Sequence, residues 1–140
     1  MPTIHHLGFL VRDLAAAVER YTQLLGVGPV ASEPLPNRGV ITARFSLGAV
    51  WLVLIEPITE DSIPARHLAR CGEGFFMLSL NSNDLKQTDQ ELIDRGMSLN
   101  WSTLRRGLSD WRVADLKDWE SFGAVIQFAE SNDDDEAEHH

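Results

Sequence analysis

Two stretches of the chain decide its fold: HHLGFLVRDL at residues 5–14 and FMLSLNSNDL at residues 76–85. When Asp13-Leu14 is aligned with Asp84-Leu85, the two copies match without a gap. His6 then falls on Met77. An internal repeat of this kind predicts two similar modules. If both residues face one pocket, one carries chemistry and the other does not.

Each copy opens a β-α-β-β-β series. A mostly apolar strand is predicted at residues 4–11, and Asp13 is a favoured N-cap for a helix that Gly26 ends. Strands follow at about 40–47 and 49–56, a short helix at 62–71, and a second series at 75–82, 84–96, 98–102, 111–115 and 123–130. Val53-Leu54-Ile55-Glu56 also matches Gln127-Phe128-Ala129-Glu130, with a slightly larger shift in numbering than the first match. This order predicts an α+β protein.

The composition excludes several classes of function. The chain has 140 residues and a net charge of -9, five of which come from the acidic segment at 133–138. Residues 131–140 are predicted to be a disordered acidic tail. Without a basic stripe, we expect no nucleic-acid partner. We also expect no membrane partner, because no apolar run is long enough to span a bilayer. The single cysteine, Cys71, and the lack of a signal peptide favour a cytoplasmic protein.

Three segments resemble the vicinal oxygen chelate superfamily, which includes glyoxalase I, bleomycin-resistance proteins, extradiol dioxygenases and methylmalonyl-CoA epimerase. They are IHHLG through DLAAAVERYTQLLGV at 4–27, LIEP at 54–57 with HLARCGEG at 67–74, and GAVIQFAE at 123–130. The segment at 67–74 is closest to the epimerase branch. Together the similarities cover nearly all of residues 4–130.

The resemblance implies two tandem βαβββ modules that form a curled mixed sheet around a shared cup. It places module one at 4–57, a linker helix at 58–73 and module two at 74–130, all within one domain at 1–130. Family members are usually homodimers, so the same is expected here. Family enzymes hold a divalent metal with four inner-face ligands: His, Gln or Glu, His, and Glu.

Carried over by position, the four ligand sites become His6, Val53, Met77 and Gln127. Valine cannot bind a metal, a thioether suits soft Cu(I), and hard divalent ions want several oxygen or imidazole donors. We therefore expect no metal and no other cofactor. His6 is either a former ligand that now acts as a proton acceptor or hydrogen-bond donor, or a strand histidine kept by ancestry.

Strand alternation predicts a largely apolar cup with a few polar groups, which is typical of a small-molecule site. Its expected ligand-binding residues are Trp51, Val53, Phe75, Met77, Ser79, Trp111 and Gln127. The alternative is that these side chains meet and fill the cup. Arg105 and Arg106 could hold a carboxylate or a CoA phosphate, although a solvated loop pair is the simpler interpretation.

Two functions from different classes remain. The first is a metal-independent protein that binds a hydrophobic, partly oxygenated small molecule in the cup. The second is a metal-free isomerase, epimerase or other proton-transfer enzyme with His6 as its acid/base, and Gln127 and Ser79 placing the substrate. A divalent-metal epimerase or lyase would need ligands recruited from elsewhere in the chain.

Overall fold

The computed structural model describes residues 2–106 and 111–130. Within them, the elements follow the order of two βαβββ series. The first series is β1 (Ile4–Leu10), α1 (Leu14–Leu25), β2 (Ala31–Leu35), β3 (Val40–Leu47) and β4 (Val50–Pro57). After α2 (Ile63–Cys71), the second is β5 (Gly74–Asn81), α3 (Leu85–Asp94), β6 (Leu99–Arg106), β7 (Arg112–Leu116) and β8 (Val125–Glu130). The α+β prediction with two tandem modules is confirmed.

The chain divides into two compact units. The N-terminal unit is His6–Met77, and the C-terminal unit combines the described parts of Met1–His5 and Leu78–His140. The predicted tail at 131–140 lies outside the described residues. No helix in the described part of the chain is both long and apolar enough to cross a membrane. The shared cup stays a prediction.

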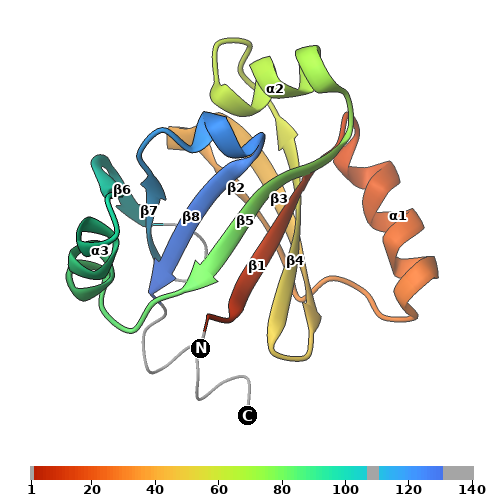
Figure 1. The fold of residues 1–140 in the computed structure, drawn as a ribbon. Coiled ribbons are helices and arrows are strands. Elements are labelled where there is room, and N and C mark those ends of the chain that lie inside the picture. Colours follow the sequence, from red (N-terminus) through yellow and green to blue (C-terminus); the bar gives the residue numbers. More distant parts are fainter. Residues whose placement is uncertain (1, 107–110, 131–140) are drawn as a thin grey trace. The chain divides into compact units, whose positions relative to one another are not determined.

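In the N-terminal unit, the strands lie in the order β2-β3-β4-β1, with α1 against one face (Figure 1). The core between helix and sheet contains the buried residues Val11, Leu14, Ala43, Phe45, Leu52 and Leu54. Because side chains alternate along a strand, the residues between these on β3 and β4 face away from α1. This second face carries the candidate site.

Both ends of α1 are set by local chemistry, as the sequence predicts. The Asp13 carboxylate accepts a hydrogen bond from Ala16 N at 3.1 Å. Gly26 follows the helix in the left-handed region, with a φ of 75°. A residue without a Cβ adopts this conformation at little cost, so glycine is the usual stop signal.

Strand β2 lies in a stretch where no strand was predicted from the sequence, between the helix that Gly26 ends and the strand at about 40–47. Its residues include Pro34, which pairs with Ile41 of β3. Proline lacks the N–H of a sheet ladder but is tolerated on edge strands. Since β2 is the first strand of the order, its free edge accommodates the missing donor.

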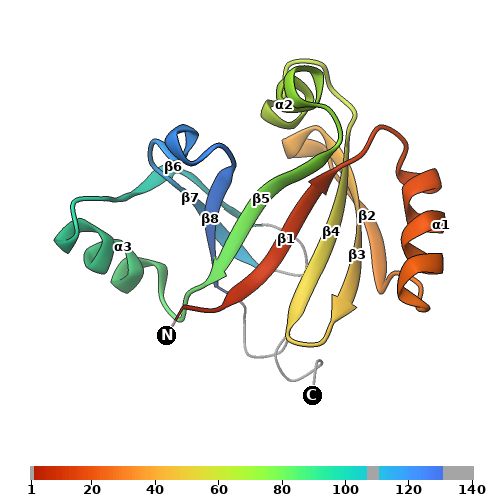
Figure 2. The same ribbon diagram turned by 45° about the vertical axis from the view of Figure 1, so that its right-hand side comes forward.

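In the C-terminal unit, the strands lie in the order β5-β8-β7-β6 (Figure 2). Helix α3 covers one face, and its core contains Leu85, Leu92, Leu99, Ala114 and Leu116, with Ile126 and Phe128 packed against it. By alternation, Asp115 and Gln127 lie on the face away from α3.

The repeat is visible in matching backbone bonds of the two units. Val11 N donates to Ile55 O at 2.9 Å, and Ser82 N donates to Ala129 O at 2.9 Å. The donors Val11 and Ser82 occupy the same position when residues 5–14 are aligned with 76–85. The acceptors Ile55 and Ala129 occupy the same position when residues 53–56 are aligned with 127–130. The pairing of β5 with β8 therefore repeats the pairing of β1 with β4.

Candidate functional site

The N-terminal unit brings four of the predicted site residues together on the face away from α1. Strands β1 and β4 are parallel, and their register pairs His6 with Trp51 and Gly8 with Val53. Paired residues of adjacent strands point to the same face of a sheet. His6, Trp51, Val53 and Met77 are all buried.

Met77 lies directly against β1. A Cβ built on Gly8 would be 3.1 Å from Met77 Cβ and 3.1 Å from Ile55 Cδ1. Real Cβ atoms rarely approach this closely, so Gly8 makes room for the methionine. An apolar side chain thus packs where the family resemblance places a metal-binding histidine.

Arg44 on β3 is a residue of this face that the sequence analysis missed. It pairs with Val53 in the sheet register, and its Cζ lies 4.6 Å from the centre of the Trp51 ring. A guanidinium stacked on an indole is a favourable cation–π arrangement. Alternation in β3 places Arg44 on the face opposite the buried Ala43 and Phe45, and this signal was available in the sequence.

Phe75 departs from the predicted group. Its side chain is 46% exposed, and its ring meets the Phe9 ring edge-on at a centroid distance of 5.8 Å. Phe9 packs against the core under α1. Aromatic edge contacts are worth about 0.5–1.5 kcal/mol beyond burial, and alternation along β5 alone takes no account of them. The structure therefore does not group Phe75 with Trp51, Val53 and Met77.

The remaining predicted residues belong to the C-terminal unit. Ser79 and Gln127 are buried, as is Trp111. The Trp111 ring meets the His5 ring edge-on, with centroids 4.4 Å apart at 88°. Trp111 thus packs inside the unit against a side chain that was not among the predicted site residues.

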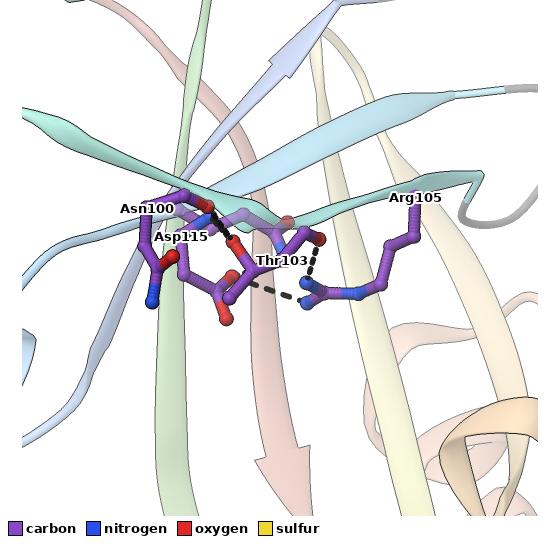
Figure 3. A network of polar contacts seen from close by, with 5 residues as sticks. Asn100, Thr103, Arg105 and Asp115 are labelled. Atoms are coloured by element: carbon purple, nitrogen blue, oxygen red, sulfur yellow. Dashed lines mark hydrogen bonds and ion pairs between the residues drawn. The ribbon is translucent and has the colours of Figure 1, made fainter.

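Gln127 belongs to a polar network that joins β6, β7 and β8. It pairs with Asp115 in the register, and its Nε2 donates to Asp115 Oδ1 at 3.4 Å. Arg105 forms an ion pair with the same Oδ1 at 3.1 Å and donates to Thr103 O at 2.6 Å (Figure 3). Thr103 Oγ1 accepts from Asp115 N at 2.8 Å and donates to Asn100 O at 2.6 Å.

This network corrects the predicted place of Arg105 and Arg106. Both belong to β6, which ends at Arg106, and not to a solvated loop. The Arg105 side chain is only 19% exposed, because the buried Asp115 carboxylate holds it. Asp115 was missed, although it shares its strand face with Val113, opposite Gln127 and Ala129 on β8.

The side chains at the four family positions do not fit a divalent metal. Val53 has no donor atom, Met77 offers a thioether, and Gln127 offers a single neutral amide oxygen. His6 is the one strong ligand of the set. Across residues 2–106 and 111–130, no three His, Cys, Asp or Glu side chains cluster in a way that could hold a metal ion.

Two βαβββ series in one chain are the arrangement that the family resemblance implies. The family model described as glyoxalase/bleomycin resistance protein/dioxygenase superfamily matches residues 5–114, and the chain belongs to this family. The suspected family is therefore confirmed.

The solved structures that resemble this chain include methylmalonyl-CoA epimerases. The chain is 29% identical over 139 residues to the uncharacterised protein YqjC of Bacillus subtilis, covering 99% of each. It is 28% identical to methylmalonyl-CoA epimerase from Mycobacterium tuberculosis, with a TM-score of 0.85 over 96% of this chain and 91% of that one. A variant of the Streptomyces coelicolor methylmalonyl-CoA epimerase, bound to 2-nitronate-propionyl-CoA, is 28% identical with a TM-score of 0.83, covering 91% of this chain and 96% of that one.

Proposed function

We propose that this protein binds a hydrophobic, partly oxygenated small molecule of the acyl-CoA thioester class, and that it does so without a metal ion. The observation that carries the proposal is the stacking of Arg44 on Trp51 beside Val53. Where family enzymes have a metal ligand, this chain has an apolar residue next to a fixed cation. A guanidinium binds carboxylates and phosphates through paired hydrogen bonds.

The ligand class is supported by the similar structures. A methylmalonyl-CoA epimerase was solved with 2-nitronate-propionyl-CoA and another with methylmalonyl-CoA. Both ligands join a short oxygenated acyl group to CoA. The apolar Val53 and Met77 suit the hydrocarbon part of such a group, and Arg44 suits its oxygens.

A metal-free proton transfer is the second candidate, and His6 is the residue that favours it. His6 is buried beside Trp51 on this face, and imidazole is the usual acid/base near neutral pH. In this version, His6 removes or delivers a proton at the carbon next to the thioester.

Metal independence is tested by calorimetric titration of Co²⁺ and Zn²⁺ into the protein. We use a His139→Ala/His140→Ala background, so that the two terminal imidazoles cannot contribute to the metal titration. The matched control is the same protein with Val53→Gln, Met77→His and Gln127→Glu, which restores the four family ligands. We expect stoichiometric binding only in the control. One tight ion per chain in the unrestored protein would contradict the proposal.

Binding and catalysis are separated by two measurements on wild type and His6→Ala. Calorimetry with propionyl-CoA and methylmalonyl-CoA reports affinity, and NMR in D₂O reports exchange of the methylmalonyl C2 proton. A binder loses affinity in His6→Ala and exchanges no proton in either form. An enzyme loses exchange and keeps affinity. If neither thioester binds to wild type, the proposed ligand class is wrong.

A further inference from the structure

Four polar side chains form a row across adjacent strands of the C-terminal unit. Three of them are Gln127, Asp115 and Arg105, which are joined by the contacts described above. The fourth is Ser79 on β5. In the N-terminal unit Gly8 pairs with Val53. In the internal repeat, Ser79 occupies the position of Gly8 and Gln127 occupies the position of Val53. Ser79 therefore lies beside Gln127, at the usual strand spacing of about 4.8 Å.

The ion pair fixes which way the Gln127 amide points. Asp115 Oδ1 forms an ion pair with Arg105, and an oxygen used in this way accepts hydrogen bonds and does not donate them. The Gln127 NH₂ group must therefore face Asp115, as the 3.4 Å contact shows. The amide oxygen faces the other way. Asp115 and Arg105 are thus positioning residues for Gln127.

Two buried polar atoms are left at the Ser79 end of the row. Ser79 Oγ and Gln127 Oε1 have no hydrogen-bond partner among the described residues. Buried polar atoms are normally satisfied, and leaving them unpaired is unfavourable. Here the unpaired set is one acceptor, the amide oxygen, and one hydroxyl that donates or accepts. The group that completes it must donate to Gln127 Oε1, and it can either accept from or donate to Ser79 Oγ.

We infer that this pair recognises an alcohol hydroxyl on the bound molecule. A hydroxyl donates one bond and accepts others, so it satisfies both atoms at once. A carboxylate or a keto oxygen has no hydrogen to give to Gln127 Oε1. The inference rests on the proposed function and narrows its ligand to a hydroxylated acyl thioester. In this inference Ser79 and Gln127 determine the specificity for a hydroxylated ligand, and Asp115 and Arg105 hold Gln127 in position.

The test compares butyryl-CoA with 2-hydroxybutyryl-CoA and 3-hydroxybutyryl-CoA by calorimetry. One hydroxylated thioester should bind at least about tenfold tighter than butyryl-CoA, because a site built for a hydroxyl discriminates against ligands that lack it. In Ser79→Ala this ratio should fall to nearly one. Equal affinities in wild type, or a ratio unchanged in Ser79→Ala, would overturn the inference.

Two further measurements decide the inference even if no thioester binds, an outcome that would count against the ligand class alone. The first is an NMR titration with 2-propanol and, separately, acetone. The Gln127 side-chain amide signals should move with the alcohol only, and Ser79→Ala should abolish the change. Equal responses to the two probes, or none, would overturn the inference.

The second measurement is thermal unfolding of the free protein. Ser79→Ala should melt at the wild-type temperature or above, since it removes an unpaired buried hydroxyl. The control Thr103→Val removes a hydroxyl that makes two bonds, so it should melt several degrees lower. If Ser79→Ala lowers the Tm by more than about 3 °C, the Ser79 hydroxyl already bonds to another group of the protein, and the inference is wrong.

Discussion

The backbone N–H of Leu14 donates a hydrogen bond to Glu56 Oε1 at 2.7 Å, so a side chain from the end of β4 satisfies the first turn of α1. The second unit repeats this bond, from Leu85 N to Glu130 Oε2 at 3.0 Å. The first turn of a helix has unpaired N–H groups and a partial positive charge, and a carboxylate offsets both. These equivalent bonds confirm the match of Glu56 with Glu130 that the sequence predicts.

Replacing Glu56 with alanine should lower the free energy of unfolding by about 1–2 kcal/mol, because a charged hydrogen bond at a helix N-terminus is lost. Glu56→Gln keeps an acceptor oxygen and should lose less. Urea unfolding followed by circular dichroism measures both. As a control, Glu60→Ala should change stability by less than about 0.5 kcal/mol, since Glu60 is exposed. Equal losses in Glu56→Ala and Glu60→Ala would show that the bond contributes little.

Adding one methyl group at Gly8 should destabilise the protein by about 1–3 kcal/mol, because Met77 and Ile55 occupy the space. The matched variant is Gly28→Ala, whose new Cβ would meet nothing within 4 Å. We expect Gly28→Ala to be neutral or slightly stabilising. Thermal unfolding of the pair isolates the steric effect, and similar melting temperatures would mean that Met77 moves aside freely.

The stability of the protein should fall with acid through His67 on α2. This side chain packs edge-on against Phe76 at 4.9 Å, its Nδ1 has no partner among the described residues, and burial followed by the charge of Arg70 lowers its pKa. The unfolded chain therefore binds a proton first as the pH falls below about 6.5. Stability is full above that pH and is lost as the pH falls toward the lowered pKa.

A His67→Phe variant should lack this part of the pH dependence. Urea unfolding at intervals between pH 7.5 and 5 measures the slope of stability against pH for both proteins. The wild-type slope should exceed that of His67→Phe in this range. Parallel curves would mean that His67 titrates equally in the folded and unfolded chain.

Arg44 should be sensitive even to conservative replacement. Arg44→Lys keeps the charge but loses the planar group stacked on Trp51, and Arg44→Met loses the charge as well. We expect propionyl-CoA affinity to fall about tenfold or more in Arg44→Met, since charge-assisted bonds contribute about 1.5–3 kcal/mol, and by less in Arg44→Lys. If Arg44→Met binds as wild type does, Arg44 does not contact the ligand.

The helices and most strands could be predicted because their signals are local. Asp13, Gly26 and Asp84 each set a helix end through backbone groups only a few residues away. The internal repeat supports the prediction, because Asp13 and Asp84 occupy equivalent positions. Strand β6 could not be predicted to its full length. Its register against β7 shifts between Asn100 and Arg105, so the alternation of side chains breaks inside the strand.

The candidate site was predictable only in part. Strand alternation indicates which face of the sheet a side chain lies on, but it does not indicate which other side chains it contacts. It assigned Trp51, Val53, Met77, Ser79 and Gln127 to inner strand faces, but it also included Phe75. It gave no reason to join Arg105 to Asp115, which meet only through the pairing of β6 with β7. The placement of Phe75 likewise depended on Phe9, a residue of another strand.

The paired carboxylates Glu56 and Glu130 have a consequence for engineering the chain. Both copies keep the hydrogen bond between this carboxylate and the first turn of the helix. The inner positions differ between the copies, since His6 matches Met77 and Val53 matches Gln127. Within one polypeptide, the inner positions have therefore changed while the carboxylate bond to the helix has not. The inner strand positions can therefore be randomised in a library that is screened for new ligands, while Glu56 and Glu130 are kept to hold the helices.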